Sequence, residues 1–207
     1  MIARFTPAFV LVLLLMATAP SARADGHIEK STAFVRDLAE QAVENITNHS
    51  LTAEERTENF RALFRKGFAV SSIARFVTGR YWRTATRQER EEYLVLFEDV
   101  IVKEWADRLF SQYNGQRLEV RGASDESVGG SPESVAIVKT ELFTGPSTSL
   151  AVDWRVASQG DIIKITDIKV DGISLATTQR EDFTSHANKN GRKFSAIIEK
   201  LREKRDP

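Results

Sequence analysis

The hydrophobic period of this chain changes twice, and this double change constrains the fold more than any other feature. Between about residues 116 and 170 apolar and polar residues alternate, as they do along a β-strand. Before and after that stretch, apolar residues recur every three or four positions, as they do along an α-helix. A chain of this kind packs helices from both of its ends against a sheet made by its middle. The sequence therefore predicts one α+β domain with the order helices, strands, helices.

Four strands are expected in the alternating stretch, separated by short segments rich in glycine, proline and serine. They are Arg117–Ala123, Ser134–Thr144, Thr148–Ala157 and Asp161–Val170. Short connections favour antiparallel neighbours, because a parallel crossover needs a dozen or more residues. In the third strand Leu150, Val152, Trp154 and Val156 fall on one face. We therefore expect a curved antiparallel sheet of four or more strands, packed against a helical layer with an apolar pocket between the layers.

Two capping boxes mark helix starts before the strands, at Thr52-Ala53-Glu54-Glu55 and Thr86-Arg87-Gln88-Glu89. The second opens the longest predicted helix, which ends near Asn114-Gly115. Ser174 is placed to cap a helix directly after the last strand. The other predicted helices are Ile28–Asn48, Ser71–Thr78 and Lys193–Arg205.

The first 24 residues have the form of a secretory signal peptide. Arg4 gives a basic start, Phe9–Ala17 is an apolar run, and Ala22-Arg23-Ala24 is a small-x-small cleavage site before Asp25. The apolar run is too short to span a bilayer comfortably, since a spanning helix needs about 20 residues. We expect a signal peptide over residues 1–24, a single domain over residues 25–207, and a soluble product in the periplasm.

Charge and cysteine content narrow the function classes. Removal of Arg4 and Arg23 leaves 27 Lys and Arg residues against 29 Asp and Glu residues. This balance argues against a nucleic-acid partner, because neutralising phosphates needs a concentrated positive surface. The chain has no cysteine, so an exported domain of this length must be held together by its apolar core.

No pattern for catalysis emerges from the sequence. The three histidines, His27, His49 and His186, have no spacing that suggests a shared metal. There is no thiol, no Gly-x-Ser-x-Gly turn and no glycine-rich phosphate loop. We predict a protein that is not an enzyme, with no catalytic residue, no metal and no cofactor.

Three segments carry a resemblance to a known family. Val170-Asp171-Gly172-Ile173-Ser174-Leu175, followed by Gln179-Arg180 and Phe183, is the most specific of them. The segment 68–86 and Asp153-Trp154-Arg155-Val156 match as well. Together they resemble the periplasmic phospholipid-binding proteins of the Mla pathway, also called the toluene-tolerance auxiliary family, over about residues 30–202. One departure is Val70-Ser71, where the family usually has an acidic residue at a helix start, and it predicts a weaker helix cap.

The resemblance implies a soluble carrier that holds the acyl chains of a phospholipid in an apolar cavity. Its partners would be the phospholipid, an outer-membrane lipoprotein complex and an inner-membrane ABC transporter. Apolar residues on the sheet and on two helices are then the candidates for lining the cavity. They are Phe64, Phe97, Val100, Leu150, Val152, Trp154, Ile163 and Ile165.

Three alternatives stay open at this point. A related branch of the family is associated with hopanoid-lipid genes, so the resemblance also allows a rigid polycyclic lipid as the ligand. Ile162, where the family often has an aromatic residue, is compatible with a pocket of different shape. An enzyme with a ketosteroid-isomerase-like fold would need a carboxylic acid in the pocket, for which Asp167 is the candidate. The third alternative is an adaptor that binds no ligand.

Overall fold

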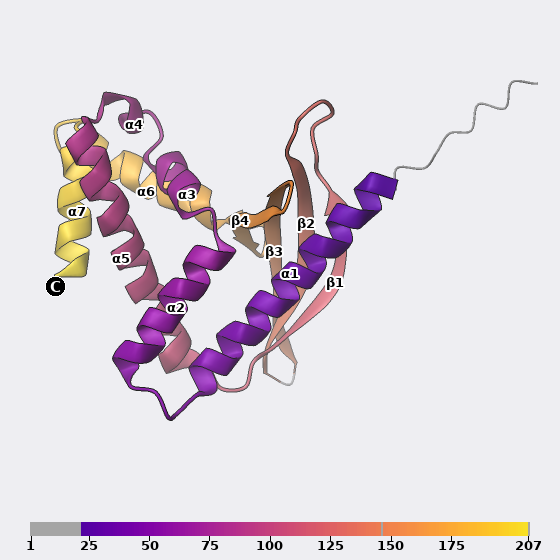
Figure 1. Ribbon diagram of the computed structural model, residues 1–207. Helices are drawn as coiled ribbons and strands as arrows, with labels where there is room; N and C mark the ends of the chain where they lie inside the picture. The colour runs from indigo at the N-terminus through magenta and orange to yellow at the C-terminus, as the bar shows by residue number, and fades with distance from the viewer. Residues whose placement is uncertain (1–21, 146, 207) are drawn as a thin grey trace, which may run out of the picture.

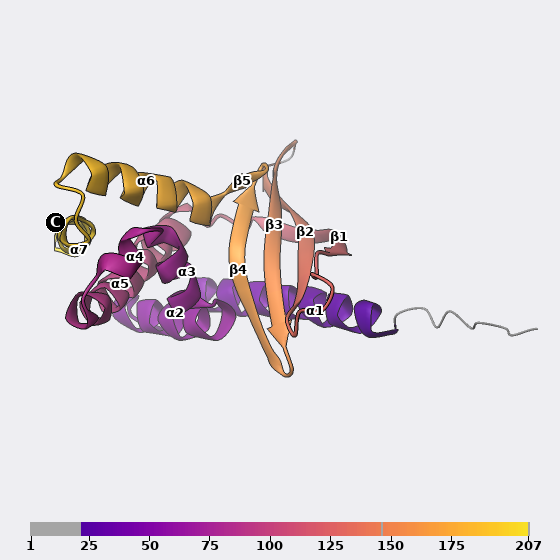
Figure 2. The same ribbon diagram turned by 90° about the horizontal axis from the view of Figure 1, so that it is seen from above.

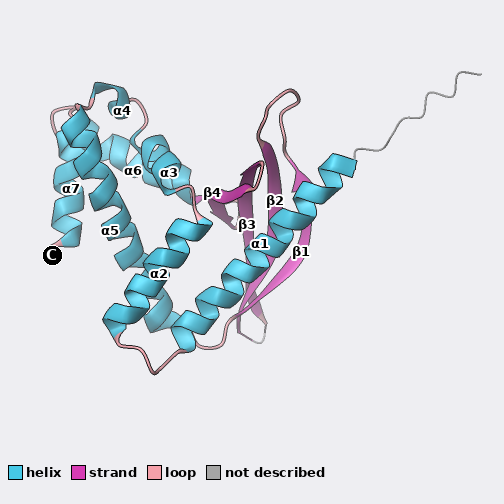
Figure 3. Ribbon diagram, in the orientation of Figure 1, coloured by secondary structure: helices cyan, strands magenta, loops and turns pink. Residues whose placement is uncertain are grey.

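The computed structural model describes residues 22–145 and 147–206 and contains seven helices and five strands within those ranges. The predicted signal peptide lies almost entirely outside the described residues. Figure 3 shows the strands together on one side of the molecule and most of the helices on the other. The helices that precede the strands are α1 (Ala22–Thr47), α2 (Ala53–Gly67), α3 (Val70–Thr78), α4 (Tyr81–Thr84) and α5 (Arg87–Gln112). The strands are β1 (Arg117–Asp125), β2 (Ser134–Gly145), β3 (Thr148–Gln159), β4 (Ile162–Val170) and β5 (Ile173–Ser174), and the last helices are α6 (Leu175–Lys189) and α7 (Ser195–Arg205).

The predicted order of helices, strands and helices is confirmed. Both capping boxes are present, with Thr52 accepting from the Glu55 amide and Thr86 accepting from the Glu89 amide. Ser174 caps α6 in the predicted way. α3 has no side-chain cap at Ala69, in line with the departure noted at Val70-Ser71. The Ala69 amide instead donates to the Ile165 carbonyl on β4, which fixes the start of α3 against the sheet.

The sheet is an antiparallel meander with the spatial order β1-β2-β3-β4-β5. β2 and β3 form its longest pair, and Figure 2 shows the strands side by side and curved. A register shift between Arg155 and Val156 in β3 interrupts the regular pairing with β4. Asp171 and Gly172 turn the chain from β4 into β5, both with positive φ.

α1 covers the sheet, although the helix now labelled α5 was expected to do so as the longest predicted helix. α1 lies diagonally across the sheet in Figure 1, whereas α2 to α7 gather beside its β4 edge. α5, the expected backbone of the helical layer, packs against α7, α2 and α3 instead. The broad apolar stripe of α5 is buried against those three helices and does not face the sheet. The structure contains no helix, among the described residues, that is long and apolar enough to cross a membrane.

Candidate functional site

The inner face of the sheet, which is the face that α1 crosses, is apolar over all four long strands. On β3 it carries Val152, Trp154 and Val156, which were predicted to share one face. The register places Val138 of β2 and Ile168 of β4 on either side of Trp154. Side chains of paired residues point to the same side of a sheet, so these residues form one continuous surface.

α1 covers only part of this surface. Its Val35 and Leu38 pack with Val138, Val156 and Ile165 in one fully buried cluster. Around that cluster the structure leaves a margin of half-buried apolar side chains on the strands. They are Val120, Ala123, Trp154, Ile163 and Ile168. The inner face is therefore sealed under α1 and incompletely covered on both sides of it.

The one polar side chain within the buried part of this face is internally satisfied. Thr140 of β2 is buried, and its hydroxyl donates to the Val152 carbonyl at 2.7 Å. The same oxygen accepts the indole N–H of Trp154 at 2.9 Å. Because the Thr140 hydroxyl and the Trp154 indole N–H both donate within the sheet, no donor on these side chains is left unsatisfied on this part of the face.

A second apolar cluster adjoins the inner face at the end of α2. Phe60 and Phe64 of α2 pack there with Val102 and Ala106 of α5. Phe68 belongs to the margin of both clusters, and its ring lies 4.6 Å from that of Phe64. An apolar path therefore runs from the sheet, past Phe68, to the space between α2 and α5.

The structure brings some of the eight predicted lining residues together and separates others. Val152, Trp154, Ile163 and Ile165 lie on or beside the inner face, and Phe64 adjoins it through Phe68. Leu150 lies towards the end of β3 and is 37% exposed, so it stands at the rim of the face.

Phe97 and Val100 do not reach the sheet. They pack with Tyr93, Leu96 and Phe194 in a third cluster, formed by α3 to α7. The physical reason is that α5 buries two sides at once, and these residues are on the side that faces α7. Val35, Leu38, Phe68 and Ile168 belong to the inner-face cluster and were not among the predicted residues, although the helical spacing of Val35 and Leu38 was visible in the sequence.

Two hollows lie on the outer surface of the helices, and neither is lined by a predicted residue. The first has a volume of about 500 Å³ and lies along α6. The second, of about 370 Å³, lies between α1 and α2 and is lined mainly by amide and charged side chains. Its floor includes Leu63, which also packs at the margin of the inner-face cluster. The groove between α1 and α2 thus lies directly outside the apolar interior.

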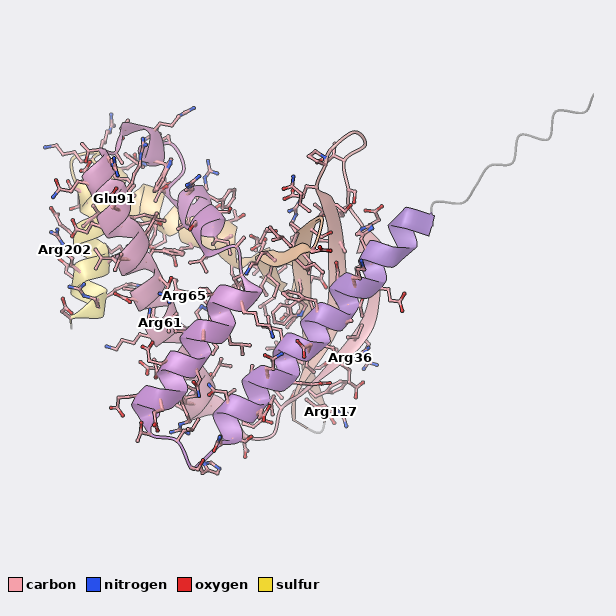
Figure 4. The ribbon with its side chains drawn as sticks, viewed as in Figure 1. Arg36, Arg61, Arg65, Glu91, Arg117 and Arg202 are labelled. Carbon is pink, nitrogen blue, oxygen red and sulfur yellow. The ribbon has the colours of Figure 1, made fainter. Side chains whose placement is uncertain are left out.

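Ion pairs hold the α2–α5 side of this region together. Arg61 of α2 bridges Glu98 at 3.2 Å and Asp99 at 2.9 Å, and Arg65 bridges Glu98 at 2.7 Å. Figure 4 shows Arg61 and Arg65 one turn apart on α2. Lys164 of β4 donates to the carbonyls of Arg65 and Lys66 at the end of the same helix. These contacts fix the position of α2 beside the β4 edge.

The candidate acid of the enzyme alternative has a structural role. Asp167 pairs with Arg155 in the register next to the shift in β3, and its carboxylate accepts the Ala176 amide at 3.1 Å. This bond satisfies a free N–H in the first turn of α6. Ile162, the position linked to a different pocket shape, is 66% exposed at the β3–β4 turn and does not shape the interior.

Within the described part of the chain, no three His, Cys, Asp or Glu side chains are grouped as a metal site would require. His27 at the start of α1 instead lies 3.3 Å from Asp125 at the end of β1. Hydrogen bonds from Ser127, with the nearby His27 adding to them, lower the pKa of Asp125. This pair ties the start of α1 to the sheet.

Comparison with known proteins identifies the family. The family model of the MlaC protein matches residues 36–203, which is most of the chain. The chain belongs to the MlaC family. This MlaC-family chain is also similar in structure to a phospholipid-binding protein from Ralstonia solanacearum that was solved in complex with a phospholipid. The two are 17% identical, the match covers 84% of this chain and 96% of the other, and the TM-score is 0.67. At that identity the match establishes a shared fold.

Proposed function

We propose that this protein is a lipid carrier which holds acyl chains against the inner face of its sheet, between β2 to β4, α1 and α2. The observation that carries the proposal is the incomplete cover of that face. Trp154, Ile163 and Ile168 stay half-buried beside a sealed core, and Leu150 is exposed at the rim. A contiguous apolar surface left partly open in this way is suited to an apolar ligand.

Energetics explain why such a carrier is useful. Each methylene that leaves water contributes about 0.8 kcal/mol, so a lipid with roughly 30 methylenes faces a barrier of about 25 kcal/mol to crossing water alone. An apolar interior removes most of that barrier. No proton transfer or bond cleavage is needed, so we propose a protein without catalysis.

Family membership and the phospholipid named for the Ralstonia protein support a glycerophospholipid as the cargo. We infer further that the chain is exported, loses residues 1–24 and works in the periplasm. There it would shuttle lipid between an outer-membrane lipoprotein complex and an inner-membrane ABC transporter. The signal-like N-terminus and the resemblance to Mla-pathway proteins support these finer steps.

Native mass spectrometry of the full-length gene product, purified from periplasmic extract, tests the proposal. We expect a polypeptide that begins at Asp25, carrying one lipid whose organic extract contains a glycerophospholipid. A polycyclic lipid in the extract would favour the hopanoid alternative. A homogeneous bare polypeptide, with no lipid in the extract, would contradict the carrier function and leave the ligand-free adaptor.

A further inference from the structure

One region of the helical layer, made by α3, α4, α6 and the loop after α6, is strongly basic, although the whole chain is neutral. Residues 75–90 and 180–193 hold nine Lys and Arg residues and three Asp and Glu residues. α4 lies beside the end of α6 there (Figure 1), and the Arg80 guanidinium and the Tyr81 hydroxyl both donate to the Asn188 carbonyl oxygen. We call this region of α3, α4, α6 and the following loop the basic end.

The cations of the basic end differ from those elsewhere in the molecule. Lys200, Arg202 and Lys204, on neighbouring α7, each pair with a carboxylate. Among the side chains that the structure describes, only Arg87 of the nine basic residues at the basic end lies within ion-pair distance of a carboxylate. The other eight have no carboxylate within ion-pair distance in residues 22–145 and 147–206.

Four of these arginines lie over aromatic rings. Arg75 and Arg90 lie over Trp82, and Arg80 lies over Tyr81. Arg180 lies 4.9 Å from the ring centre of Phe76, which is itself 44% exposed. Stacking restricts these side chains without neutralising them. Arg80 and Arg90 also donate to groups of the chain itself, whereas the Arg75 and Arg180 guanidinium groups make no hydrogen bond to the described residues and can donate to anionic oxygens.

A hollow of about 500 Å³ lies within the basic end, along the outer side of α6. Arg180 and Lys189 stand near its two ends, and Thr184 and Ser185 lie between them. Neither hydroxyl makes a hydrogen bond within the described chain, so both can donate to a bound anion. Glu181 is the one carboxylate in the lining. Cations flanking free hydroxyls over this volume suit a phosphate with a small polar group attached.

We infer that the basic end docks on the surface of an anionic bilayer, with one phosphate head group in the α6 hollow and Phe76 at the interface. Basic residues without an ion-pair partner, together with one exposed aromatic ring, are the features that draw a protein to anionic lipid. Each basic residue near such a surface increases partitioning about fivefold. This surface is separate from the apolar interior, so the inference holds whether or not lipid is carried inside.

Sedimentation with vesicles tests this docking. Vesicles of phosphatidylcholine, alone or with about 30% phosphatidylglycerol, would be mixed with the full-length processed protein at roughly 50 mM and roughly 500 mM NaCl. We expect the protein to sediment with the anionic vesicles at low salt only. The variant Arg83→Glu with Lys189→Glu is expected to lose binding by at least about 25-fold, since both side chains are exposed and make no described side-chain bond.

The matched control is Lys30→Glu with Arg36→Glu, which makes the same change of charge at exposed positions on α1. It is expected to keep most of the binding. Equal losses in the two double variants would overturn the assignment of the surface. Absence of wild-type binding to anionic vesicles would overturn the inference and favour an acidic protein as the partner. Binding of inorganic phosphate that is lost in the variant Arg83→Glu with Lys189→Glu, together with no wild-type binding to anionic vesicles, would mean a site for free phosphate and would overturn membrane docking.

Discussion

A bulky apolar side chain at position 152 distinguishes a lined cavity from a filled core. Val152 lies on the inner face between Thr140 and Val170 in the register, and its neighbour two residues away, Leu150, is 37% exposed. In the variant Val152→Trp, the indole can extend into the uncovered margin of the face. The free energy of unfolding should therefore fall by less than about 1.5 kcal/mol, in the lower part of the roughly 1–3 kcal/mol that added core volume usually costs.

The matched control is Val138→Trp, on the same face of the neighbouring strand. Val138 is fully buried under Val35 of α1, so the added rings have no space to enter. The cost there should reach about 3 kcal/mol or more, because overpacking displaces α1 as a whole. In a domain of this size 1.5 kcal/mol corresponds to roughly 3–6 °C in Tm, which separates the two variants clearly.

Denaturant unfolding of delipidated protein, followed by circular dichroism, measures the two costs. Delipidation is necessary because a bound lipid would add its own binding free energy to the stability. Lipid retention is measured in parallel by native mass spectrometry. We expect Val152→Trp to fold and to lose its lipid. An equal loss of stability in both variants would show a filled core, and full lipid retention by folded Val152→Trp would show that the acyl chains lie elsewhere.

Two further substitutions test the helical core and the contact between β4 and α6. Burial raises the pKa of Tyr93 well above its usual value, so above about pH 10 only the unfolded chain ionises there and the free energy of unfolding should fall as the pH rises. The variant Tyr93→Phe loses the hydrogen bond to the Ala74 carbonyl and should be less stable by about 1 kcal/mol at pH 7. Denaturant titrations at several pH values should show a smaller alkaline loss of stability in this variant than in the wild type. Asp167→Ala should lower stability by about 1 kcal/mol, through the lost bond to the Ala176 amide, and leave lipid retention unchanged. An unchanged stability with lost lipid binding would return Asp167 to a functional role.

The order of elements could be predicted from the sequence because its signals are local. The capping boxes at Thr52 and Thr86 each place a hydroxyl and a carboxylate three residues apart, and both form. The alternating period gave strands that agree with β1 to β4 to within two residues. α4 and β5 were missed because four residues and two residues carry no period.

The lining residues of the site were predicted less well, because they depend on which helix packs against the sheet. Val152 and Ile165 follow from strand alternation once one face is known to be covered. The periodicity of α5 cannot say that Phe97 faces α7 while Val102 faces α2, because both lie within one broad apolar stripe. Nor could it say that α1, far away in sequence, is the helix that crosses the sheet.

The meander order of the sheet also bears on how the chain folds. Every long strand pairs with its neighbour in sequence, so the sheet can grow one hairpin at a time, with only short loops to close. α1 is made first, whereas its partners Val138, Val156 and Ile165 come roughly 100 residues or more later, so we expect α1 to dock on the sheet late. Until the β2–β3 pair has formed, the apolar stripe of α1 lacks Val138 and Val156 as partners on the sheet. The slowest step in folding should therefore be the docking of α1, and hydrogen exchange during refolding should protect the β2–β3 pair before it protects α1.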